Sequence, residues 1–356
     1  MLTETEFLDL VSGRRQGVGP ALARFGLWLA SGFYGTGVTL RNVAYNLGIL
    51  SPRRAGLPVI SIGNITTGGT GKTPFAAWLA RWFRNHGVRV CFVSRGYRAE
   101  SGKQNDEALV LDQLCPDVPH LQNPDRFLSA EIARIELESQ LIVLDDGFQH
   151  RQLARDLDIV LIDALNPFGY GHWLPRGLLR EPRMGVTRAQ ILVVTRVDQA
   201  ERHALELLLH RVRGLHPDGI VVQASFPPLG LISTSGTRVP LTQLHGQTVA
   251  AFCGIGNPEA FESSLRLAGC RVAAFRRFAD HHPYSIDDVT DLTRWTKDVA
   301  PTLVVTTQKD LVKLDIDRLG GVPLWALEIG TQIHQGAEAL GAKLSKILER
   351  IPRDDG

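Results

Sequence analysis

Residues 66–73 read Thr-Thr-Gly-Gly-Thr-Gly-Lys-Thr and stand between two apolar segments. The run before them, Pro58 to Gly63, is short and rich in β-branched residues, which is typical of a buried strand. After them, apolar residues recur at helical spacing between Pro74 and His86. A glycine-rich turn between strand and helix binds phosphate, because glycines let consecutive N–H groups converge on an anion at the positive end of the helix dipole. The stretch therefore predicts a P-loop.

The loop is a variant, since Thr66 stands where the usual pattern has glycine. Lys72 supplies a full positive charge for the phosphates of ATP, and the Thr73 hydroxyl is the group that reaches Mg²⁺ in such loops. A simpler interpretation is a Gly/Thr-rich turn with an exposed lysine. The preceding strand, the Gly-Lys-Thr sequence and the following helix together favour a nucleotide-binding loop. We expect all eight residues to contact ATP, namely Thr66, Thr67, Gly68, Gly69, Thr70, Gly71, Lys72 and Thr73.

The length of 356 residues allows two or three domains with sizeable cores. A net charge of +2 does not indicate the strongly basic surface that nucleic-acid-binding proteins carry. The four cysteines are scattered without pairing or metal-ligand spacing, which suits a reducing compartment.

Apolar strands alternate with helical patterns through residue 218, which predicts an α/β fold with a doubly wound, mostly parallel sheet. A second, smaller α/β lobe follows. We therefore expect an N-terminal helical segment at 1–57, a nucleotide-binding domain at 58–225, the smaller lobe at 226–330, and a C-terminal helix and tail at 331–356.

The segment from Phe25 to Leu40 carries no charge but is short of the roughly 18 to 20 apolar residues that span a bilayer. Acidic residues stand where a signal peptide would be basic. Leu22, Phe25, Leu29 and Phe33 share one helical face, and arginines lie nearby, as in a helix that lies on a membrane surface. The alternative is a helix packed on its own domain, and these residues leave both interpretations open.

Carboxylates follow a short apolar strand, Leu141 to Leu144, in the sequence Asp145-Asp146-Gly147-Phe148-Gln149-His150. Carboxylates at the tip of a strand parallel to the P-loop strand are where nucleotide enzymes hold magnesium. The alternative is that Asp145 and Asp146 belong to an acidic surface turn without a bound ion.

Three further features are ambiguous from the residues alone. Arg95 and Arg98 follow a predicted strand, Val88 to Ser94, where they are placed to meet phosphate, although surface arginines are common. Asp106 reads as a helix N-cap. Adjacent histidines such as His281 and His282 point in different directions, which disfavours a shared metal ion. Taken alone, the pair reads more readily as part of a capped loop than as a catalytic element.

Seven stretches together resemble, in order and over nearly the whole chain, the tetraacyldisaccharide 4′-kinase family of lipid A biosynthesis. They are Ser61-Ile-Gly-Asn-Ile-Thr-Thr-Gly-Gly-Thr-Gly-Lys-Thr-Pro74, Ser94-Arg-Gly-Tyr97, Asp106-Glu107, Asp145-Asp-Gly-Phe-Gln-His150, Leu174-Pro-Arg-Gly-Leu-Leu-Arg-Glu-Pro182, Gly254-Ile-Gly-Asn-Pro258 and Asp280-His281.

The resemblance implies transfer of the γ-phosphate of ATP to the 4′-hydroxyl of an acylated glucosamine disaccharide 1-phosphate, which gives lipid IVA. It also implies two α/β/α lobes joined by a short two-stranded linker, and a peripheral enzyme on the cytoplasmic face of the inner membrane. Because a lipid with four acyl chains stays in the bilayer, the segment from Phe25 to Leu40 becomes the expected membrane contact.

The resemblance also implies residue roles, with ATP and Mg²⁺ as the nucleotide and the ion. Asp106 is the expected general base, assisted by His281, and Lys72 holds the phosphates. The expected magnesium and phosphate shell comprises Thr73, Asp145, Asp146, Glu107 and Gln149. We assign Arg95, Arg98, His150 and Arg176 to the lipid substrate.

The rival hypothesis is a P-loop ATPase or GTPase switch protein at the membrane. Thr195-Arg-Val-Asp198 and Thr306-Thr-Gln-Lys-Asp310 faintly resemble base-reading motifs. The Gly-Gly-x-Gly-Lys-Thr form of the loop resembles that of partitioning and metal-insertion ATPases. Those ATPases carry a second lysine where this chain has Thr67, and they do not need a second lobe with Asp280-His281.

Overall fold

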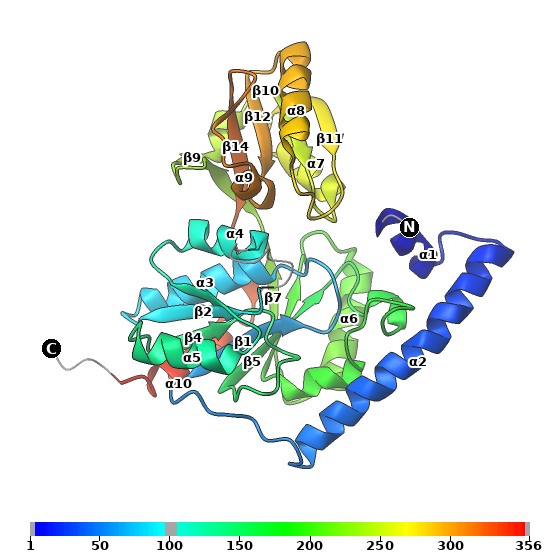
Figure 1. Cartoon of the computed structure of the whole chain (residues 1–356), viewed down its shortest axis with the longest axis vertical. Helices are drawn as coiled ribbons and strands as arrows, with labels where there is room; N and C mark the ends of the chain where they lie inside the picture. Colours follow the sequence, from blue (N-terminus) through cyan, green and yellow to red (C-terminus); the bar gives the residue numbers. More distant parts are fainter. Residues whose placement is uncertain (1–3, 97–104, 353–356) are drawn as a thin grey trace. The chain divides into compact units, whose positions relative to one another are not determined.

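The computed structural model describes residues 4–96 and 105–352, which divide into two compact units. The larger unit contains the described residues 4–96, 117–226 and 331–352, and the smaller unit contains 105–116 and 227–330. Figure 1 colours the chain along its sequence. Strand β7 of the larger unit leads into β8 of the smaller one, and β14 leads back into β15, so two extended segments connect the units, as the resemblance implies.

The larger unit is built on an eight-stranded sheet in the order β15-β7-β6-β5-β1-β4-β2-β3. Its strands are β1 (Val59–Asn64), β2 (Val90–Ser94), β3 (His120–Gln122), β4 (Leu141–Leu144), β5 (Leu157–Asp163), β6 (Ile191–Thr195), β7 (Ile220–Ser225) and β15 (Gln332–Gln335). Every pairing is parallel except that of β15 with β7. Strand β1 pairs with β4 on one side and β5 on the other, so the loop after it opens at the point where the winding of the sheet reverses.

Helices and short 3₁₀ turns accompany this sheet. They are α1 (Glu4–Ser12), α2 (Val18–Asn46), α3 (Lys72–Arg84), α5 (Arg126–Ile135), α6 (Arg202–Leu215), α10 (Ala337–Leu348), η1 (Gly169–Gly171) and η2 (Arg183–Arg188). Phe75, Leu79 and Phe83 recur at helical spacing on α3 and are fully buried, so the apolar face of this helix fixes its start behind the P-loop.

The smaller unit has a seven-stranded mixed sheet in the order β11-β10-β12-β14-β8-β9, with β13 paired to β14. Its elements are α4 (Asp106–Leu114), β8 (Pro228–Ile232), β9 (Arg238–Pro240), η3 (Leu241–Leu244), β10 (Thr248–Cys253), α7 (Pro258–Leu267), β11 (Arg271–Arg277), α8 (Ile286–Val299), β12 (Leu303–Thr307), α9 (Gln308–Leu314), β13 (Arg318–Leu319) and β14 (Val322–Ile329). Strands β11, β10, β12 and β14 run parallel to one another, and β8 and β9 complete the sheet antiparallel.

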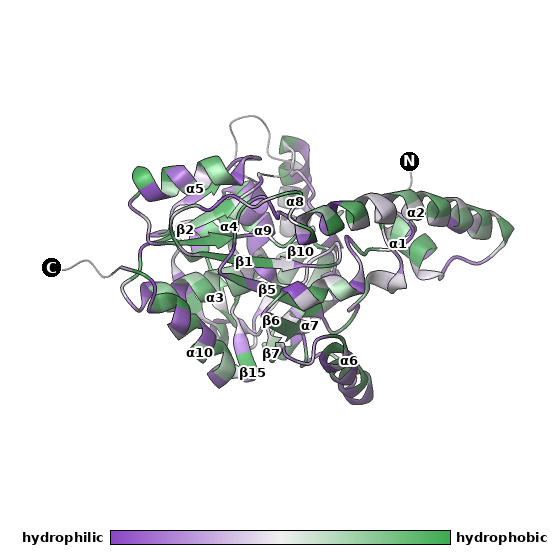
Figure 2. Cartoon of the chain, turned by 90° about the horizontal axis from the view of Figure 1, so that it is seen from below, coloured by the Kyte–Doolittle hydropathy of each residue, from purple (hydrophilic) through white to green (hydrophobic). Residues whose placement is uncertain are grey.

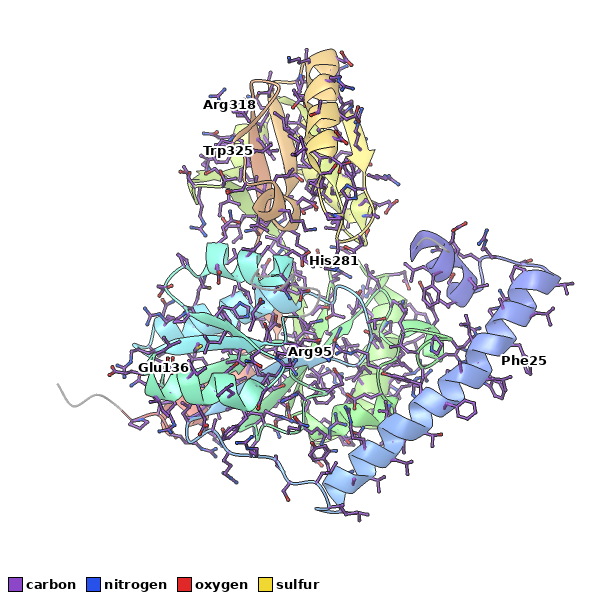
Figure 3. All side chains as sticks on the ribbon, viewed as in Figure 1. Phe25, Arg95, Glu136, His281, Arg318 and Trp325 are labelled. Carbon is purple, nitrogen blue, oxygen red and sulfur yellow. The ribbon has the colours of Figure 1, made fainter. Side chains whose placement is uncertain are left out.

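Helix α2 has two opposite faces. One face packs on the larger unit: Gly35 is buried so closely against Trp173 that a Cβ atom there would overlap the indole ring, and Arg151 donates to the Asn42 carbonyl (3.1 Å). The other face is apolar and exposed, and Figure 2 colours much of α2 as hydrophobic. This face consists of Val18, Leu22, Phe25, Leu29, Phe33, Leu40, Val43 and Leu47, which fall within about 80° of the helix circumference at roughly 100° per residue. Figure 3 shows the Phe25 side chain pointing away from the helix.

The predicted doubly wound α/β class with a second, smaller lobe is confirmed. Two features differ from the sequence analysis. Residues 105–116, which fall inside the predicted 58–225 domain, group with the smaller unit because α4 packs against α9. The interpretation of Asp106 as an N-cap is wrong: Asn105 caps α4 by accepting from the Ala108 N–H (2.9 Å), which leaves Asp106 as the first helical residue.

Candidate active site

The P-loop closes on the start of α3. Gly71 caps this helix with a left-handed backbone (φ 88°), which favours glycine. A Cβ atom at this position would also lie 2.0 Å from the Phe226 ring, so any other residue would clash. The Asn64 side chain, at the end of β1, donates to Thr70 Oγ1 (3.2 Å) and so ties the strand to the loop. Thr195 Oγ1 donates to the Thr70 carbonyl (3.0 Å) from β6. The loop is therefore held from two strands before any nucleotide arrives.

Lys72 and Arg180 meet at one carboxylate of the Asp145-Asp146 pair. Asp146 Oδ1 lies 3.6 Å from Lys72 Nζ and accepts from Arg180 Nη1 at 2.7 Å. Both cations also donate to Asn64 Oδ1, at 3.4 and 3.3 Å. Burial raises the pKa of Asp146, but the charges of Lys72 and Arg180 outweigh burial and hold the pKa well below its usual range. Asp146 is therefore ionised at neutral pH and holds the Lys72 side chain in position.

Asp145 directly follows β4 and is 2 % exposed. Its Oδ1 accepts from the Asp146 N–H (3.0 Å), and Asp146 itself has φ +50°, so the two carboxylates diverge from a sharp turn. The Thr73 hydroxyl is also buried. Across residues 4–96 and 105–352 there is no group of three or more His, Cys, Asp or Glu side chains suited to a metal ion. The donors here are hydroxyl and carboxylate oxygens, which fit Mg²⁺, an ion that takes one or two carboxylates and completes its shell with phosphate and water.

Gln149 acts as a donor in the structure. Its Nε2 atom donates to the Asn64 carbonyl (2.8 Å) and to Glu181 Oε1 (2.7 Å), while Arg188 pairs with Glu181 Oε2 at 2.7 Å. This chain of contacts ties the loop that carries Arg180 to the end of β1. Gln149 therefore braces the site, and its Oε1 atom is buried without a hydrogen-bond partner among the described residues.

Arg126 was not among the predicted site residues. It begins α5 and is 7 % exposed, and its Nε atom is buried without a hydrogen-bond partner in the described part of the chain. Burial and the charges of Arg95 and Arg180 lower its pKa, whereas Asp145 and Asp146 raise it. A buried guanidinium among other cations is costly unless an anion joins it. The sequence carries one signal for Arg126. The residue follows Asn123-Pro-Asp at the start of a helix that comes after a strand.

His150 lies next to this cluster. Burial, Arg126 and Arg155 lower the pKa of His150 to about 4, so its imidazole is neutral at physiological pH. Arg95 follows β2 and is exposed. Arg98 lies outside the described residues.

A second constellation lies within the smaller unit. His281 Nδ1 and Asp106 Oδ2 are 2.7 Å apart, and an ionised carboxylate only accepts, so Nδ1 carries the proton and donates. His281 has φ +58° in the loop after β11, and its neighbour His282 turns instead to Asp288 (3.1 Å). The expectation that the two histidines point in different directions is confirmed.

Two lysines of α9 complete this constellation. Lys313 Nζ lies 3.4 Å from Asp106 Oδ2, and Lys309 Nζ lies 3.6 Å from Glu107 Oε1. Within its unit, Glu107 is thus an ion-pair partner of Lys309. Burial raises the pKa of Asp106, but the hydrogen bond from His281 and the charges of Lys309 and Lys313 hold it well below its usual range. The same hydrogen bond raises the pKa of His281, against the effect of burial. The sequence analysis missed both lysines because it predicted no helix at residues 308–314.

Arg176 contacts α1 within the larger unit. Its Nη1 donates to the Val11 carbonyl of α1 (2.8 Å), and its side chain lines a groove with Arg24, Phe25, Trp28 and His172. Asp310, part of the stretch that faintly resembles a base-reading motif, is fully buried and accepts from the Gly254 N–H (3.0 Å) and from Thr307 Oγ1 (2.6 Å). Its carboxylate is therefore engaged inside the smaller unit.

A profile of the family described as tetraacyldisaccharide-1-P 4′-kinase matches residues 23–349. The chain belongs to the tetraacyldisaccharide-1-P 4′-kinase family. Among curated relatives, the tetraacyldisaccharide 4′-kinase of Anaeromyxobacter sp. (strain Fw109-5) is 37 % identical over 95 % of each chain. That of Halothermothrix orenii (strain H 168) is 33 % identical over 88 % of this chain and 89 % of the relative.

A solved structure of this kinase family is also similar. LpxK from Aquifex aeolicus in complex with ATP matches with a TM-score of 0.73 and 29 % identity, over 91 % of this chain and 99 % of that one. The family resemblance that the sequence motifs indicated is thereby confirmed.

Proposed function

We propose that this chain is a lipid kinase that transfers the γ-phosphate of ATP to the 4′-hydroxyl of a tetraacyldisaccharide 1-phosphate, giving lipid IVA in lipid A biosynthesis. The observation that carries the proposal is membership of the 4′-kinase family over residues 23–349, together with an intact glycine loop whose lysine is held against Asp146 (3.6 Å).

On the nucleotide side, Lys72 and the N–H groups at the start of α3 bind the β- and γ-phosphates. Asp146 holds Lys72 and Arg180 in position until ATP arrives, and Arg126 adds a buried positive charge beside both aspartates. Phosphoryl transfer depends mainly on positioning and on neutralising charge at the oxygens of the transferred group. These three cations supply that neutralisation.

Magnesium fits Thr73 and Asp145 as the protein ligands, with Asp146 beside them, and when bound it neutralises the phosphate oxygens. Gln149 and Glu107 already have other partners in the structure, which favours a bracing role for Gln149 and an ion-pair role for Glu107.

On the acceptor side, Asp106 is the general base. His281 and Lys313 both contact Oδ2, so Oδ1 is the oxygen left to take the proton of the sugar hydroxyl. A carboxylate of low pKa serves here because, in a loose transition state, the hydroxyl becomes acidic only as its bond to phosphorus forms. His281 and Lys313 orient the carboxylate and keep it ionised.

We place the enzyme at the cytoplasmic face of the inner membrane, with the exposed apolar face of α2 in contact with the lipid surface. None of the helices that the structure describes is long and apolar enough to cross a bilayer. The opposite face of α2 is fixed to the larger unit through Gly35 and Asn42. A helix with one packed face and one apolar exposed face suits a peripheral contact.

The test is transfer of labelled γ-phosphate from Mg-ATP to tetraacyldisaccharide 1-phosphate in mixed micelles, with Lys72→Ala as the control. We expect labelled lipid bisphosphate that disappears in the control. Free labelled phosphate without labelled lipid would contradict the kinase proposal and favour a switch ATPase.

A further inference from the structure

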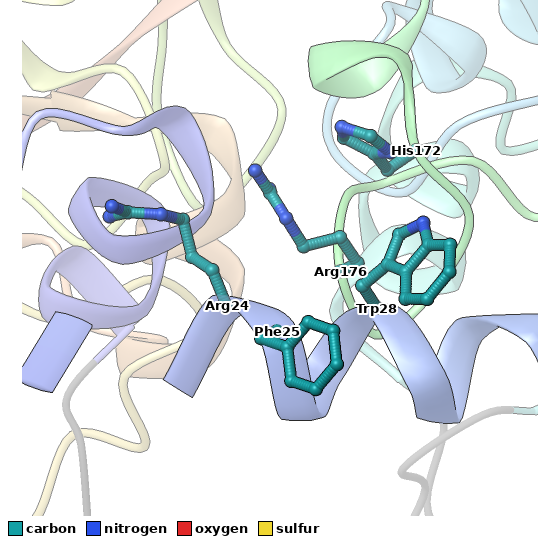
Figure 4. Close-up of a pocket in the computed structure, with 5 residues that line it drawn as sticks. All are labelled: Arg24, Phe25, Trp28, His172 and Arg176. Carbon is teal, nitrogen blue, oxygen red and sulfur yellow. The ribbon is translucent and has the colours of Figure 1, made fainter. Parts of the chain in front are cut away.

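A shallow, open groove of about 370 Å³ lies between α2 and the loop that follows η1. Figure 4 shows Arg24, Phe25 and Trp28 on α2, with Arg176 and His172 on the facing loop. The Phe25 and Trp28 rings are stacked with centroids 6.0 Å apart. One wall is therefore aromatic, and the remaining lining groups are basic.

The basic groups of this groove have no acidic counterpart in the part of the chain that the structure describes. Arg24 Nη1 donates to the Arg15 carbonyl (2.7 Å) and Arg176 Nη1 to the Val11 carbonyl (2.8 Å), so each guanidinium is fixed in direction through one nitrogen while its charge stays unneutralised. Burial and the charge of Arg24 lower the pKa of Arg176, and burial, Arg176 and Arg183 lower that of His172. Cations that repel one another in a partly desolvated groove favour a bound anion.

The neighbouring surface indicates what carries the anion. Phe25 belongs both to the groove and to the exposed apolar face of α2, and Trp28 is 52 % exposed beside it. Phe25 and Trp28 therefore join the exposed apolar face of α2 to the basic groups of the groove. Tyr34 donates to the Arg180 carbonyl (3.0 Å) and lies ten residues after Arg24 on α2, a distance of about 15 Å along the helix axis. Arg24 is therefore set back from Arg180 and the proposed phosphate-binding residues.

We propose that this groove binds the headgroup phosphate of an anionic bilayer phospholipid, so that the enzyme docks on anionic lipid at a defined site. The inference rests on the proposed membrane contact of α2 and not on the kinase reaction. Binding of the groove to the phosphate of the lipid substrate is the competing outcome.

The experiment measures partitioning of the full chain onto vesicles of phosphatidylcholine alone and of phosphatidylcholine with phosphatidylglycerol. The groove variant is Arg24→Gln with Arg176→Gln. Its charge-matched control is Arg14→Gln with Arg15→Gln, because these arginines lie on the same segment but pair with Asp9 and Glu6. We expect the groove variant to lose about tenfold more affinity than the control for the anionic vesicles. Both should bind neutral vesicles as the unmodified chain does.

A second variant, His172→Glu, keeps both arginines and their bonds to the Arg15 and Val11 carbonyls while it adds an internal carboxylate to the groove. We expect it to lose the preference for anionic vesicles as well. Equal losses in the groove variant and its control would overturn the proposal, since they would show only non-specific attraction. An unchanged vesicle affinity with a raised KM for the substrate in neutral micelles would also overturn it and would assign the groove to the substrate phosphate. Failure of the unmodified chain to bind any vesicle would overturn both the proposal and the membrane contact of α2 on which it rests.

Discussion

The His281 imidazole donates from Nδ1 to Oδ2 of Asp106 across 2.7 Å, although 175 residues separate the two in the chain. Asp106 is the first residue of α4, and His281 lies in the loop after β11, so the smaller unit assembles both partners itself. The pair joins an ionised carboxylate to an imidazole of raised pKa, which is an arrangement suited to accepting a proton from an alcohol.

The first prediction concerns this pair. Asp106→Ala should lower kcat by about 10²- to 10⁴-fold, because the sugar hydroxyl loses its proton acceptor. His281→Gln should cost less, since it removes only an orienting group. The KM for ATP should stay within a factor of about two in both variants. Steady-state kinetics in mixed micelles measure these values, and a large change in ATP affinity with kcat intact would show that the pair is structural.

The second prediction separates the two lysines of α9. Lys313→Met removes the contact at 3.4 Å that fixes Asp106 Oδ2, so the plateau kcat should fall by roughly ten- to a hundredfold. Lys309→Met is the matched control, because Lys309 acts on Asp106 through charge while it contacts Glu107. The plateau kcat of the Lys309→Met variant should change little.

Both lysine variants should also shift the pH profile. Each lysine lowers the pKa of Asp106, so its loss raises that pKa, and the acid limb of kcat/KM should move to higher pH. A pH profile of the two variants and the unmodified enzyme measures the shift. Movement of the limb to lower pH would contradict the assignment of Asp106 as the base.

The third prediction concerns Arg126, a buried cation that has Arg95 and Arg180 nearby. Arg126→Met removes a buried charge whose Nε atom has no hydrogen-bond partner among the described residues, so the melting temperature of the ATP-free protein should stay the same or rise. The same change should lower kcat/KM by about 10²- to 10³-fold, because a phosphate-stabilising cation is lost. Thermal unfolding and kinetics on the same samples provide the test. A lower melting temperature with normal kinetics would mean that Arg126 serves the fold.

The fourth prediction tests the exposed face of α2. Phe25→Ser, Leu29→Ser and Phe33→Ser in one variant should reduce partitioning onto neutral vesicles by at least about a hundredfold, since three large apolar side chains no longer enter the lipid. The control variant carries Leu128→Ser, Ile135→Ser and Leu207→Ser, which alter exposed apolar residues elsewhere in the larger unit. Its partitioning should be unchanged. Equal loss in both variants would show that α2 has no special part in membrane contact.

Point substitutions are preferable to deleting the N-terminal segment, as the contacts of α2 show. Tyr34 bonds to the Arg180 carbonyl, and Gly35 lies against Trp173, in the loop that also carries Arg180. Deletion would therefore disturb the surroundings of Arg180 and Asp146 as well as remove the apolar face. The sequence left open a helix on the membrane and a helix packed on its own domain. The structure shows the packed face, and the membrane contact stays a proposal about the exposed one.

The sequence by itself determined the features that local patterns encode. The run from Val59 to Thr73 specifies a buried strand, a glycine loop and a helix start, because β-branched periodicity, glycine and helix amphipathicity act over a few residues. The alternation of strand and helix patterns indicated the α/β class, and the family motifs indicated the 4′-kinase family; both are confirmed. The residue roles and the magnesium site stay predictions.

Only the tertiary structure decided which side chains meet. Lys313 and Asp106 are 207 residues apart by number, and nothing in a seven-residue stretch such as α9 indicates that it faces α4. Gln149 turned out to be engaged as a donor. Arg126 turned out to be buried, with an Nε atom that has no hydrogen-bond partner in the described part of the chain. Both outcomes depend on packing between distant strands. Pairing and burial arise from contacts across the chain, whereas turn and helix signals are local, and this is why the loop could be read from the sequence and the environment of the base could not.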